Sequence, residues 1–359
     1  MNAAAIASAF RMEGNAVSCN PSGNGHINKT YTVTTGTGHR YILQNINHRV
    51  FQDVDALMNN VVAVTNHLRA RCADPRRVLT LVPTLDGAFY TLAQDGNYYR
   101  MFEFVENSVC LDQAENENDF FQSAVAFGEF QNQLADFPAD TLVETIPHFH
   151  DTIDRYRQFK EVLRRDPLGR SRDCREDIAF ALVREEEGGT LVRMLQDGKL
   201  PLRVTHNDTK LNNVMLDRDT RTPLCVIDLD TVMPGLAGND FGDSIRFGAS
   251  TAEEDEPDLS KVHLSMPLYT AFTKGFLGAC GKSLTPIEIE TLPLAAKLIT
   301  LELGVRFLTD HLQGDTYFSI HRENHNLDRC RTQFKLVSEM EAHWDEMNRV
   351  VKDVYEGLA

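Results

Sequence analysis

Polar and apolar residues alternate along the first third of the chain, which predicts β-strands there. The segment KTYTVTTG alternates, turns at Gly36 to Gly38 and resumes as RYILQNI, a pattern typical of a β-hairpin. Apolar residues then recur every three or four positions over residues 53–72, so we expect an amphipathic helix. Three further strands are predicted, at residues 78–83, 88–93 and 98–105.

Helical periodicity replaces alternation in the rest of the chain. Amphipathic helices are predicted over residues 115–137, 149–165 and 174–198, and a short mixed segment over residues 203–232. A long, almost wholly apolar helix is predicted to begin after Thr285. This Thr can cap the helix, the Pro that follows suits the first turn, and the Glu three residues on can bond back.

The order of these elements predicts an α+β fold with two lobes. Residues 1–105 would form a small β-rich N-lobe, with an antiparallel sheet and one helix that cover a nucleotide. Residues 106–359 would form a larger, mainly helical C-lobe with the catalytic and substrate-binding residues. An extended connector is expected near residues 103–107, and ligands usually bind in clefts at such junctions.

Charge and cysteine content narrow the classes of function. Lys and Arg number 36 against 52 Asp and Glu, a net charge of −16, so nucleic acids and anionic membranes are disfavoured as partners. The seven cysteines are scattered, and no run approaches the roughly 20 apolar residues of a membrane helix. We expect a cytoplasmic protein with reduced thiols, a monomer or small homo-oligomer, and a surface helix instead of a signal peptide at the N-terminus.

The segment VTHNDTKLNNVMLD has the spacing of a phosphotransfer site. Asp208 follows His206 by two residues, and Asn213 follows Asp208 by five. An apolar stretch, a turn and a second apolar stretch come next, and the second stretch ends at Asp228. This order predicts a hairpin with Asp208, Asn213 and Asp228 at one end.

Phosphoryl transfer requires these side chains. One carboxylate orients and deprotonates the attacking hydroxyl, a role that we assign to Asp208. An amide oxygen and a second carboxylate bind Mg²⁺ against the phosphates of ATP, a role that we assign to Asn213 and Asp228. The letters DFG at Asp240 spell another metal motif, but they follow a loop and begin a helical stretch. We therefore expect Asp240 to cap that helix or to brace the catalytic loop.

At these residues the chain resembles the aminoglycoside phosphotransferase and choline kinase superfamily, which has a bilobal protein-kinase-like fold. Over essentially the whole chain it further resembles the anomeric sugar kinases, in the stretches YILQNINHRVF, HNDTKLNNVMLD, IDLDTVMPG, DFGDSIR, RFLTDHLQGD and HNLDRCR. The resemblance implies ATP- and Mg²⁺-dependent phosphorylation of the C1 hydroxyl of N-acetylhexosamines, N-acetylglucosamine or N-acetylgalactosamine, in amino-sugar salvage. The alternatives are a kinase for choline, homoserine or an aminoglycoside, and a pseudokinase that binds nucleotide without transfer.

The expected nucleotide contacts depart from those of protein kinases. Gln44 occupies the strand position where a phosphate-binding Lys is expected, and the helix over residues 53–72 has no Glu to pair with a Lys. The loop NPSGNGHIN either covers phosphates with its backbone amides or is a plain glycine turn. Its candidate residues are Gly23, Asn24 and Gly25. Adenine would meet the backbone of the connector at Glu103, Phe104 and Val105.

The remaining substrate contacts are expected mainly from the helical lobe. Arg306 lies within the apolar helix, where a buried guanidinium needs a partner, either Asp310 one turn later or a sugar oxygen. Tyr317 and Trp344 are candidates for packing on a pyranose face or an N-acetyl methyl group, and ordinary core packing is the alternative. Thr231, three residues after the predicted metal ligand Asp228, is a candidate donor to a substrate hydroxyl.

Overall fold

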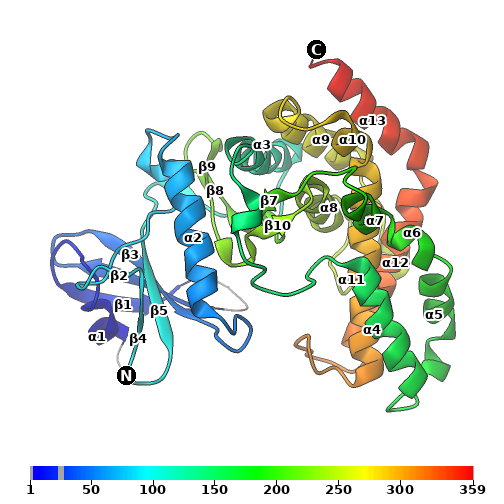
Figure 1. The fold of residues 1–359 in the computed structure, drawn as a ribbon, viewed down its shortest axis with the longest axis horizontal. Coiled ribbons are helices and arrows are strands. Elements are labelled where there is room, and N and C mark those ends of the chain that lie inside the picture. Colours follow the sequence, from blue (N-terminus) through cyan, green and yellow to red (C-terminus); the bar gives the residue numbers. More distant parts are fainter. Residues whose placement is uncertain (1–2, 23–27, 359) are drawn as a thin grey trace. The chain divides into compact units, whose positions relative to one another are not determined.

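The computed structural model describes residues 3–22 and 28–358, which form two compact units. The first unit comprises Met1–Cys110, Asp136–Pro147 and Val214–Pro234, and the second comprises Leu111–Ala135, His148–Asn213 and Gly235–Ala359. The first contains two antiparallel sheets, whereas the second is mainly helical (Figure 1). The predicted α+β fold, with a small antiparallel sheet and a larger helical part, is confirmed.

The larger sheet of the first unit has five strands in the order β1-β2-β3-β5-β4. Their bounds are β1 Ala16–Pro21, β2 Lys29–Thr35, β3 Arg40–Ile46, β4 Tyr90–Leu92 and β5 Tyr98–Glu103. The predicted hairpin is β2–β3, with Lys29 opposite Asn45. A short helix α1 (Ala3–Ala7) precedes the sheet, and the predicted helix is α2 (Val54–Arg69), which Asp53 caps through a bond from Ala56 N.

The prediction of a strand over residues 78–83 is wrong. Part of this backbone nevertheless forms hydrogen bonds with β5. Leu81 forms only an isolated bridge with Phe102, and the Val82 amide donates to the carbonyl of Met101 (2.8 Å). The next residue is Pro83, which has no N–H with which to continue a ladder. The pairing therefore ends before it becomes a strand.

The smaller sheet of the first unit contains the second predicted hairpin. Strands β8 (Val214–Asp217) and β9 (Pro223–Val226) pair with each other, and β6 (Ser108–Val109) pairs with β8 on its other side. The strand–turn–strand prediction is thus confirmed. The chain then enters the 3-10 turn η5 (Leu229–Thr231) and the short strand β10 (Met233–Gly235).

The second unit is organised around α11 (Leu292–Gln313), a helix that is buried around most of its circumference and packs on α4, α8 and α12. The other elements are α3 Glu117–Gln133, α4 Thr152–Arg165, α5 Arg175–Leu182, α6 Glu185–Gly188, α7 Thr190–Gln196, β7 Arg203–Thr205, α8 Ala237–Gly248, α9 Met266–Cys280, α10 Pro286–Glu290, α12 His325–Ala342 and α13 Trp344–Glu356. The prediction of a buried apolar helix is confirmed.

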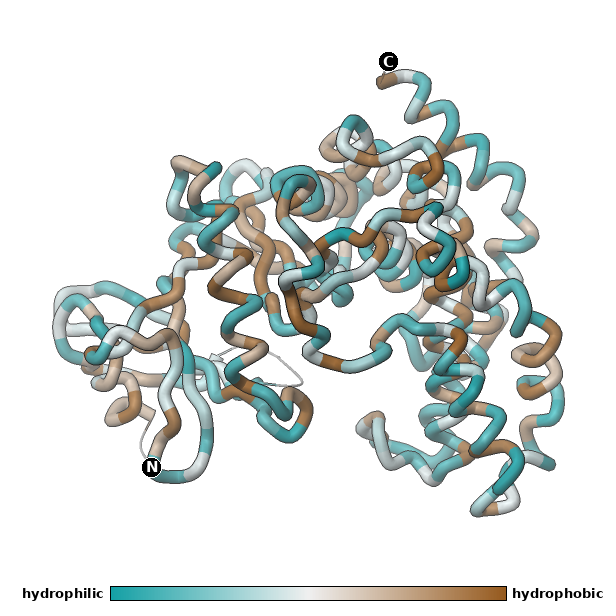
Figure 2. The backbone as a smooth tube through the Cα atoms, viewed as in Figure 1, coloured by the Kyte–Doolittle hydropathy of each residue, from teal (hydrophilic) through white to brown (hydrophobic). Residues whose placement is uncertain are grey.

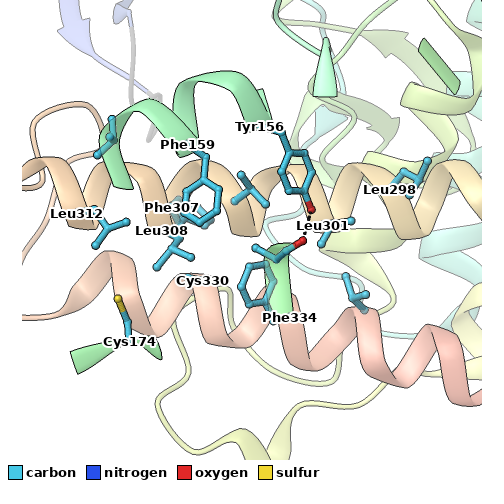
Figure 3. Close-up of a cluster of buried hydrophobic side chains, with 14 of the residues drawn as sticks. Tyr156, Phe159, Cys174, Leu298, Leu301, Phe307, Leu308, Leu312, Cys330 and Phe334 are labelled. Carbon is cyan, nitrogen blue, oxygen red and sulfur yellow. Dashed lines mark hydrogen bonds between the residues drawn. The ribbon is translucent and has the colours of Figure 1, made fainter. Parts of the chain in front are cut away.

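Large aromatic side chains fill the core around α11 (Figure 3). Tyr156 and Phe159 extend from α4, and Phe334 extends from α12. The Tyr156 hydroxyl donates to the carbonyl of Ala181 at 2.9 Å, so this buried polar group is satisfied. Along α12 and α13, hydrophobic residues are interspersed among hydrophilic ones, as expected for helices with one face on a core (Figure 2).

Two of the predicted helices are interrupted. The helix expected over residues 174–198 is divided into α5, α6 and α7, and Gly188 lies where a Cβ would approach the Tyr156 ring at 2.9 Å. The apolar helix has the predicted capping box at Thr285, but it divides into α10 and α11 at Thr291. Pro293 cannot donate the backbone hydrogen bond that a continuous helix would need there.

None of the helices within residues 3–22 and 28–358 is both long enough and apolar enough to span a bilayer.

Candidate active site

The predicted base lies in a loop of the second unit that begins after β7. Asn213 Nδ2 donates to the Asp208 carbonyl (2.8 Å) and to its Oδ2 (3.1 Å), so the two residues are brought together as predicted. Lys210 Nζ lies 3.1 Å from the other carboxylate oxygen, Oδ1. Burial favours a raised pKa for Asp208, but the positive charge of Lys210 and the bond from Asn213 outweigh it and lower the pKa. The carboxylate is therefore ionised at neutral pH.

Lys210 is a residue that the sequence analysis missed. Its position two residues after the predicted base was a usable signal, because a loop residue at that spacing can turn its side chain back toward the carboxylate. Asp208 in turn raises the pKa of Lys210, against the effect of burial, so the ammonium is charged. The site thus contains a carboxylate and a cation in direct contact.

Asp240 braces this loop from α8. Its Oδ2 accepts from the amide of His206 (3.0 Å) and from Gln131 Nε2, and its Oδ1 accepts from the amide of Asn207 (2.8 Å). Leu236, not Asp240, is the N-cap of α8. Of the two roles expected for Asp240, the structure shows bracing and excludes capping, and both carboxylate oxygens are already used.

A second buried carboxylate, Asp243, holds the next residue of the loop. Its Oδ2 accepts from the amide of Thr209 (2.8 Å). Its Oδ1 accepts from Arg246 Nε and Nη2, while Arg246 Nη1 reaches Glu254 (2.7 Å). The loop amides donate to the buried carboxylates of Asp240 and Asp243, so α8 fixes the backbone around Asp208.

Asp228 lies in the first unit, two residues after the end of β9. Its backbone is left-handed, with φ 58° and ψ 58°, a conformation that Asp adopts more readily than most residues. The neighbouring Asp230 is buried, forms an ion pair with Arg100 and accepts from Asn28 Nδ2. The carboxylates of Asp230 and Asp240 both accept hydrogen bonds from protein donors.

The donor types of the predicted metal ligands suit Mg²⁺. The amide nitrogen of Asn213 donates to Asp208, which turns the amide oxygen away from that residue. An amide oxygen and a carboxylate are hard ligands of the kind that Mg²⁺ takes together with phosphate oxygens. The part of the chain that the structure describes has no group of three or more His, Cys, Asp or Glu side chains that could hold a metal alone.

Of the residues expected to contact the nucleotide, Gly23, Asn24 and Gly25 lie outside the described residues.

Gln44 forms hydrogen bonds inside the sheet. Its Oε1 atom accepts from Nε (3.0 Å) and Nη2 (2.9 Å) of Arg100, the residue opposite it on β5. The cation that was expected on β3 therefore stands on the adjacent strand. Sequence reasoning missed Arg100, because strand register is not visible in the local pattern of β5.

The backbone of the connector residues expected to bind adenine is engaged in hydrogen bonds within the protein. The amides of Glu103 and Phe104 donate to the carbonyls of Thr80 and Arg40, so neither N–H is available to a ligand in this conformation. The carbonyl of Val105 accepts from Ser108 Oγ.

The predicted substrate residues lie in three places. Arg306 and Tyr317 are together in the second unit, where the guanidinium carbon lies 5.9 Å from the Tyr317 ring centroid. Trp344 begins α13, and its ring is 4.7 Å from Lys297 Nζ. Thr231 is buried in η5 of the first unit. The sequence grouped these residues by their chemistry, and the structure brings Arg306 and Tyr317 into contact.

Arg306 is surrounded by aromatic rings and by one buried carboxylate. Its guanidinium also lies 5.2 Å from the Phe149 ring centroid and 5.5 Å from that of Phe318. Burial, and secondarily Arg155, lower its pKa, while Glu302 opposes this effect. Asp310 is occupied elsewhere, since it accepts from the backbone amides of residues 316–318.

Polar groups beside Arg306 retain binding capacity. Glu302 accepts from Thr152 Oγ1 (2.8 Å) and lies 3.1 Å from His150 Nδ1. Arg155 Nη2 donates to the carbonyl of Phe149. Within residues 3–22 and 28–358, the buried His150 Nε2 and Arg155 Nε atoms have no hydrogen-bond partner. Buried polar atoms of this kind are usually satisfied, so these two are candidates for contact with a polar ligand.

Comparison with known proteins gives a family match and several structural neighbours. Residues 18–269 match the model of the phosphotransferase enzyme family, APH. A microcompartment-associated aminopropanol kinase has 17% identity over 96% of this chain and 98% of its own, with a TM-score of 0.63. An aminoglycoside phosphotransferase from Alicyclobacillus acidocaldarius has 14% identity, coverage of 97% and 95%, and a TM-score of 0.62. Amicoumacin kinase, in complex with AMP-PNP and Ca²⁺, has 13% identity, coverage of 94% and 92%, and a TM-score of 0.63. At these identities the likeness shows a shared kinase-like fold.

Proposed function

Because this chain belongs to the phosphotransferase enzyme family, whose model matches residues 18–269, we propose that it is an anomeric sugar kinase. It would transfer the γ-phosphate of ATP to the C1 hydroxyl of N-acetylglucosamine or N-acetylgalactosamine, giving an N-acetylhexosamine 1-phosphate. Phosphotransfer to a small molecule follows from the family. The sugar is supported by the resemblance of the whole chain to anomeric sugar kinases and by the surroundings of Arg306.

Asp208 is the base in this proposal, with Asn213 and Asp228 as the ligands of Mg²⁺. The ion would supply positive charge to the phosphates of ATP as the phosphoryl group moves. Asp208 would accept the proton of the attacking hydroxyl, in a direct in-line transfer without a phosphoenzyme. Lys210, 3.1 Å from Asp208, would add a positive charge next to the transferred group.

Residues 1–105 would bind the nucleotide. We keep Gly23, Asn24 and Gly25 as candidates for covering the phosphates, and the backbone of residues 103–105 for adenine. Gln44 holds Arg100 through two hydrogen bonds, so its part would be to orient that arginine. No direct contact between Gln44 and phosphate is required.

The observation that carries the choice of acceptor is the aromatic cluster around Arg306. A choline or aminoglycoside site needs aromatic or acidic groups that face a ligand cation. Here the three rings already surround the protein's own guanidinium. Arg155 adds a second positive charge, and Glu302 is the one buried carboxylate described beside them. Such a cluster favours a neutral ligand rich in oxygen, such as an acetylated sugar, over an amine.

The anomeric position fits a site with a single carboxylate base. The C1 hydroxyl of a free sugar belongs to a hemiacetal and is more acidic than the other ring hydroxyls. A carboxylate whose pKa is lowered, as that of Asp208 is, is a weak base and suits a comparatively acidic hydroxyl.

The test is an ADP-release assay with Mg²⁺ATP and a panel of acceptors. The panel contains N-acetylglucosamine, N-acetylgalactosamine, glucose, choline, homoserine and an aminoglycoside. We expect the two N-acetylhexosamines to be the best acceptors, with the phosphate on C1 by NMR. Faster turnover of choline or an aminoglycoside would refute the proposed acceptor class. Nucleotide binding without turnover of any acceptor would instead indicate a pseudokinase.

A further inference from the structure

A buried ion pair lies two residues from the proposed metal ligand Asp228. Arg100 on β5 is 1% exposed and Asp230 in η5 is 2% exposed. Arg100 Nη1 pairs with Asp230 Oδ1, while Nε and Nη2 both donate to Gln44 Oε1. All three guanidinium nitrogens are therefore engaged by the sheet or by Asp230, and Met58 Sδ lies 3.9 Å from Nη1.

The segment that follows Asp228 is held from several other elements of the first unit. The second carboxylate oxygen of Asp230 accepts from Asn28 Nδ2, and Asn28 Oδ1 accepts from the amide of Asn47 (2.9 Å). The Asp230 carbonyl accepts from Thr145 Oγ1 at 3.0 Å. Asn60 Nδ2, from α2, donates to the carbonyl of Val232 at 3.1 Å. The backbone on the C-terminal side of Asp228 is thus fixed by contacts to Asn28, β5, α2 and the loop at Thr145.

A buried ion pair is weak evidence for stability, because removing two charges from water costs about as much as their attraction returns. Such pairs are better attested as devices that fix a particular arrangement. Asp228 has a left-handed backbone, which persists only where its surroundings determine it. Metal ligands must be held to within about 0.5 Å of their working position.

We propose that the Arg100–Asp230 pair, with Asn28, is a positioning device that holds Asp228 for the metal ion. The inference rests on the proposed role of Asp228 as a metal ligand. In protein kinases a strand lysine pairs with a helix glutamate and grips phosphate. Here Arg100 on β5 pairs with Asp230, two residues after the proposed metal ligand Asp228. The hydrogen-bond donors of Arg100 are already occupied. Arg100 therefore acts on the metal site through Asp230 and not by touching phosphate.

The experiment measures the binding of Mn²⁺, as a spectroscopic substitute for Mg²⁺, to the full chain with a non-hydrolysable ATP analogue. The variant is Arg100→Met with Asp230→Asn, which removes both buried charges and leaves neither unpaired. We expect a folded protein whose Kd for Mn²⁺ is raised ~10-fold or more, as is usual when the partners of metal ligands are removed.

The matched control is Arg184→Met with Glu341→Gln, which removes a bidentate pair of the second unit (2.9 and 2.7 Å). Its Mn²⁺ affinity should equal that of the wild type, whatever its melting temperature. If the Arg100/Asp230 variant does not fold, Asn28→Ala carries the test, because it removes no charge. We expect that variant to bind Mn²⁺ several-fold more weakly, about 3- to 10-fold.

Asp228→Asn serves as the reference for the metal site. Weak Mn²⁺ binding by Asp228→Asn together with wild-type binding by a folded Arg100/Asp230 variant, or by Asn28→Ala, would overturn the positioning role alone. Wild-type Mn²⁺ binding by Asp228→Asn would overturn the metal assignment on which it depends. Neither result depends on the identity of the acceptor, so an error in the proposed sugar would not disturb the test.

Discussion

Asp208 is held as a carboxylate by its immediate neighbours, Lys210 and Asn213. Asp208→Asn keeps the bond from Asn213 to the backbone carbonyl and should fold and bind ATP. We expect kcat to fall ~10²–10⁴-fold, the usual range for a lost general base. Steady-state kinetics with N-acetylglucosamine, alongside a nucleotide-binding assay, measure this. Near-normal turnover would remove Asp208 from the chemistry.

The lowered pKa of Asp208 predicts a pH profile. If Asp208 is the base, as proposed, the deprotonated carboxylate is the active form, and activity should be lost only as the pH falls below the ordinary Asp range of about 3.9. Lys210→Met removes the charge that opposes burial, which raises the pKa and moves the acid limb to higher pH. The profile of kcat/KM, from about pH 2.5 to pH 8, reports the free-enzyme value. An unmoved limb in Lys210→Met would show that this contact does not set the pKa.

Asp228 and Asp240 should respond differently to the same change. Asp228→Asn should reduce Mg²⁺-dependent turnover ~10³-fold or more, since charge held at the phosphates is central to this chemistry. Asp240→Asn disturbs a carboxylate that accepts from two amides and Gln131 and should mainly cost stability, ~1–3 kcal/mol. Mg²⁺ titrations and thermal melts compare them. The reverse pattern, with Mg²⁺ dependence lost only in Asp240→Asn, would refute the assignment.

Among the elements, α11 arranges the proposed acceptor contacts. Glu302 and Arg306 are four residues apart and so lie on one face, one turn from each other. Arg306→Met should raise the KM for the sugar ~10- to 100-fold, the range for a lost hydrogen bond to a charged group, and leave the KM for ATP unchanged. Arg331→Met, which breaks a half-exposed pair with Asp177, is the control. Equal effects of both variants on the sugar KM would remove Arg306 from the acceptor site.

The loop that contains Asp208 and the hairpin after it were predictable because their signals are local. The spacing of Asp208 and Asn213, the two apolar stretches and the turn between them all lie within one segment of sequence. The capping box at Thr285 was predictable for the same reason. Lys210 could have been found in the same way, from its position two residues after the base.

Contacts between distant segments were not predictable. Arg100 faces Gln44 only through the register of β3 and β5, and it meets Asp230 only in the folded first unit. His150 and Arg155 join Arg306 from about 150 residues away in the chain, and no local pattern links them. The break at Gly188 depends on its packing against Tyr156, which propensity alone does not contain.

At the scale of the whole molecule, the net charge and the proposed acceptor site favour opposite classes of ligand. The net charge of −16 would attract cationic acceptors from solution. That attraction is screened beyond about 8 Å at physiological salt. Binding should therefore be decided by the groups at contact distance, which in the proposed acceptor site include the cations Arg155 and Arg306. We expect the molecule to reject amines in spite of its overall charge.

The anomeric claim is tested most directly by blocking the hydroxyl that it names. N-acetylglucosamine and its methyl glycoside differ only at C1, so the acetamide and the other hydroxyls can still bind. Phosphate transfer from ATP is followed for both by ³¹P NMR under the same conditions. The account predicts an anomeric phosphate from the free sugar and no phosphorylated product from the methyl glycoside. Rapid phosphorylation of the methyl glycoside would contradict it and move the reaction to another hydroxyl.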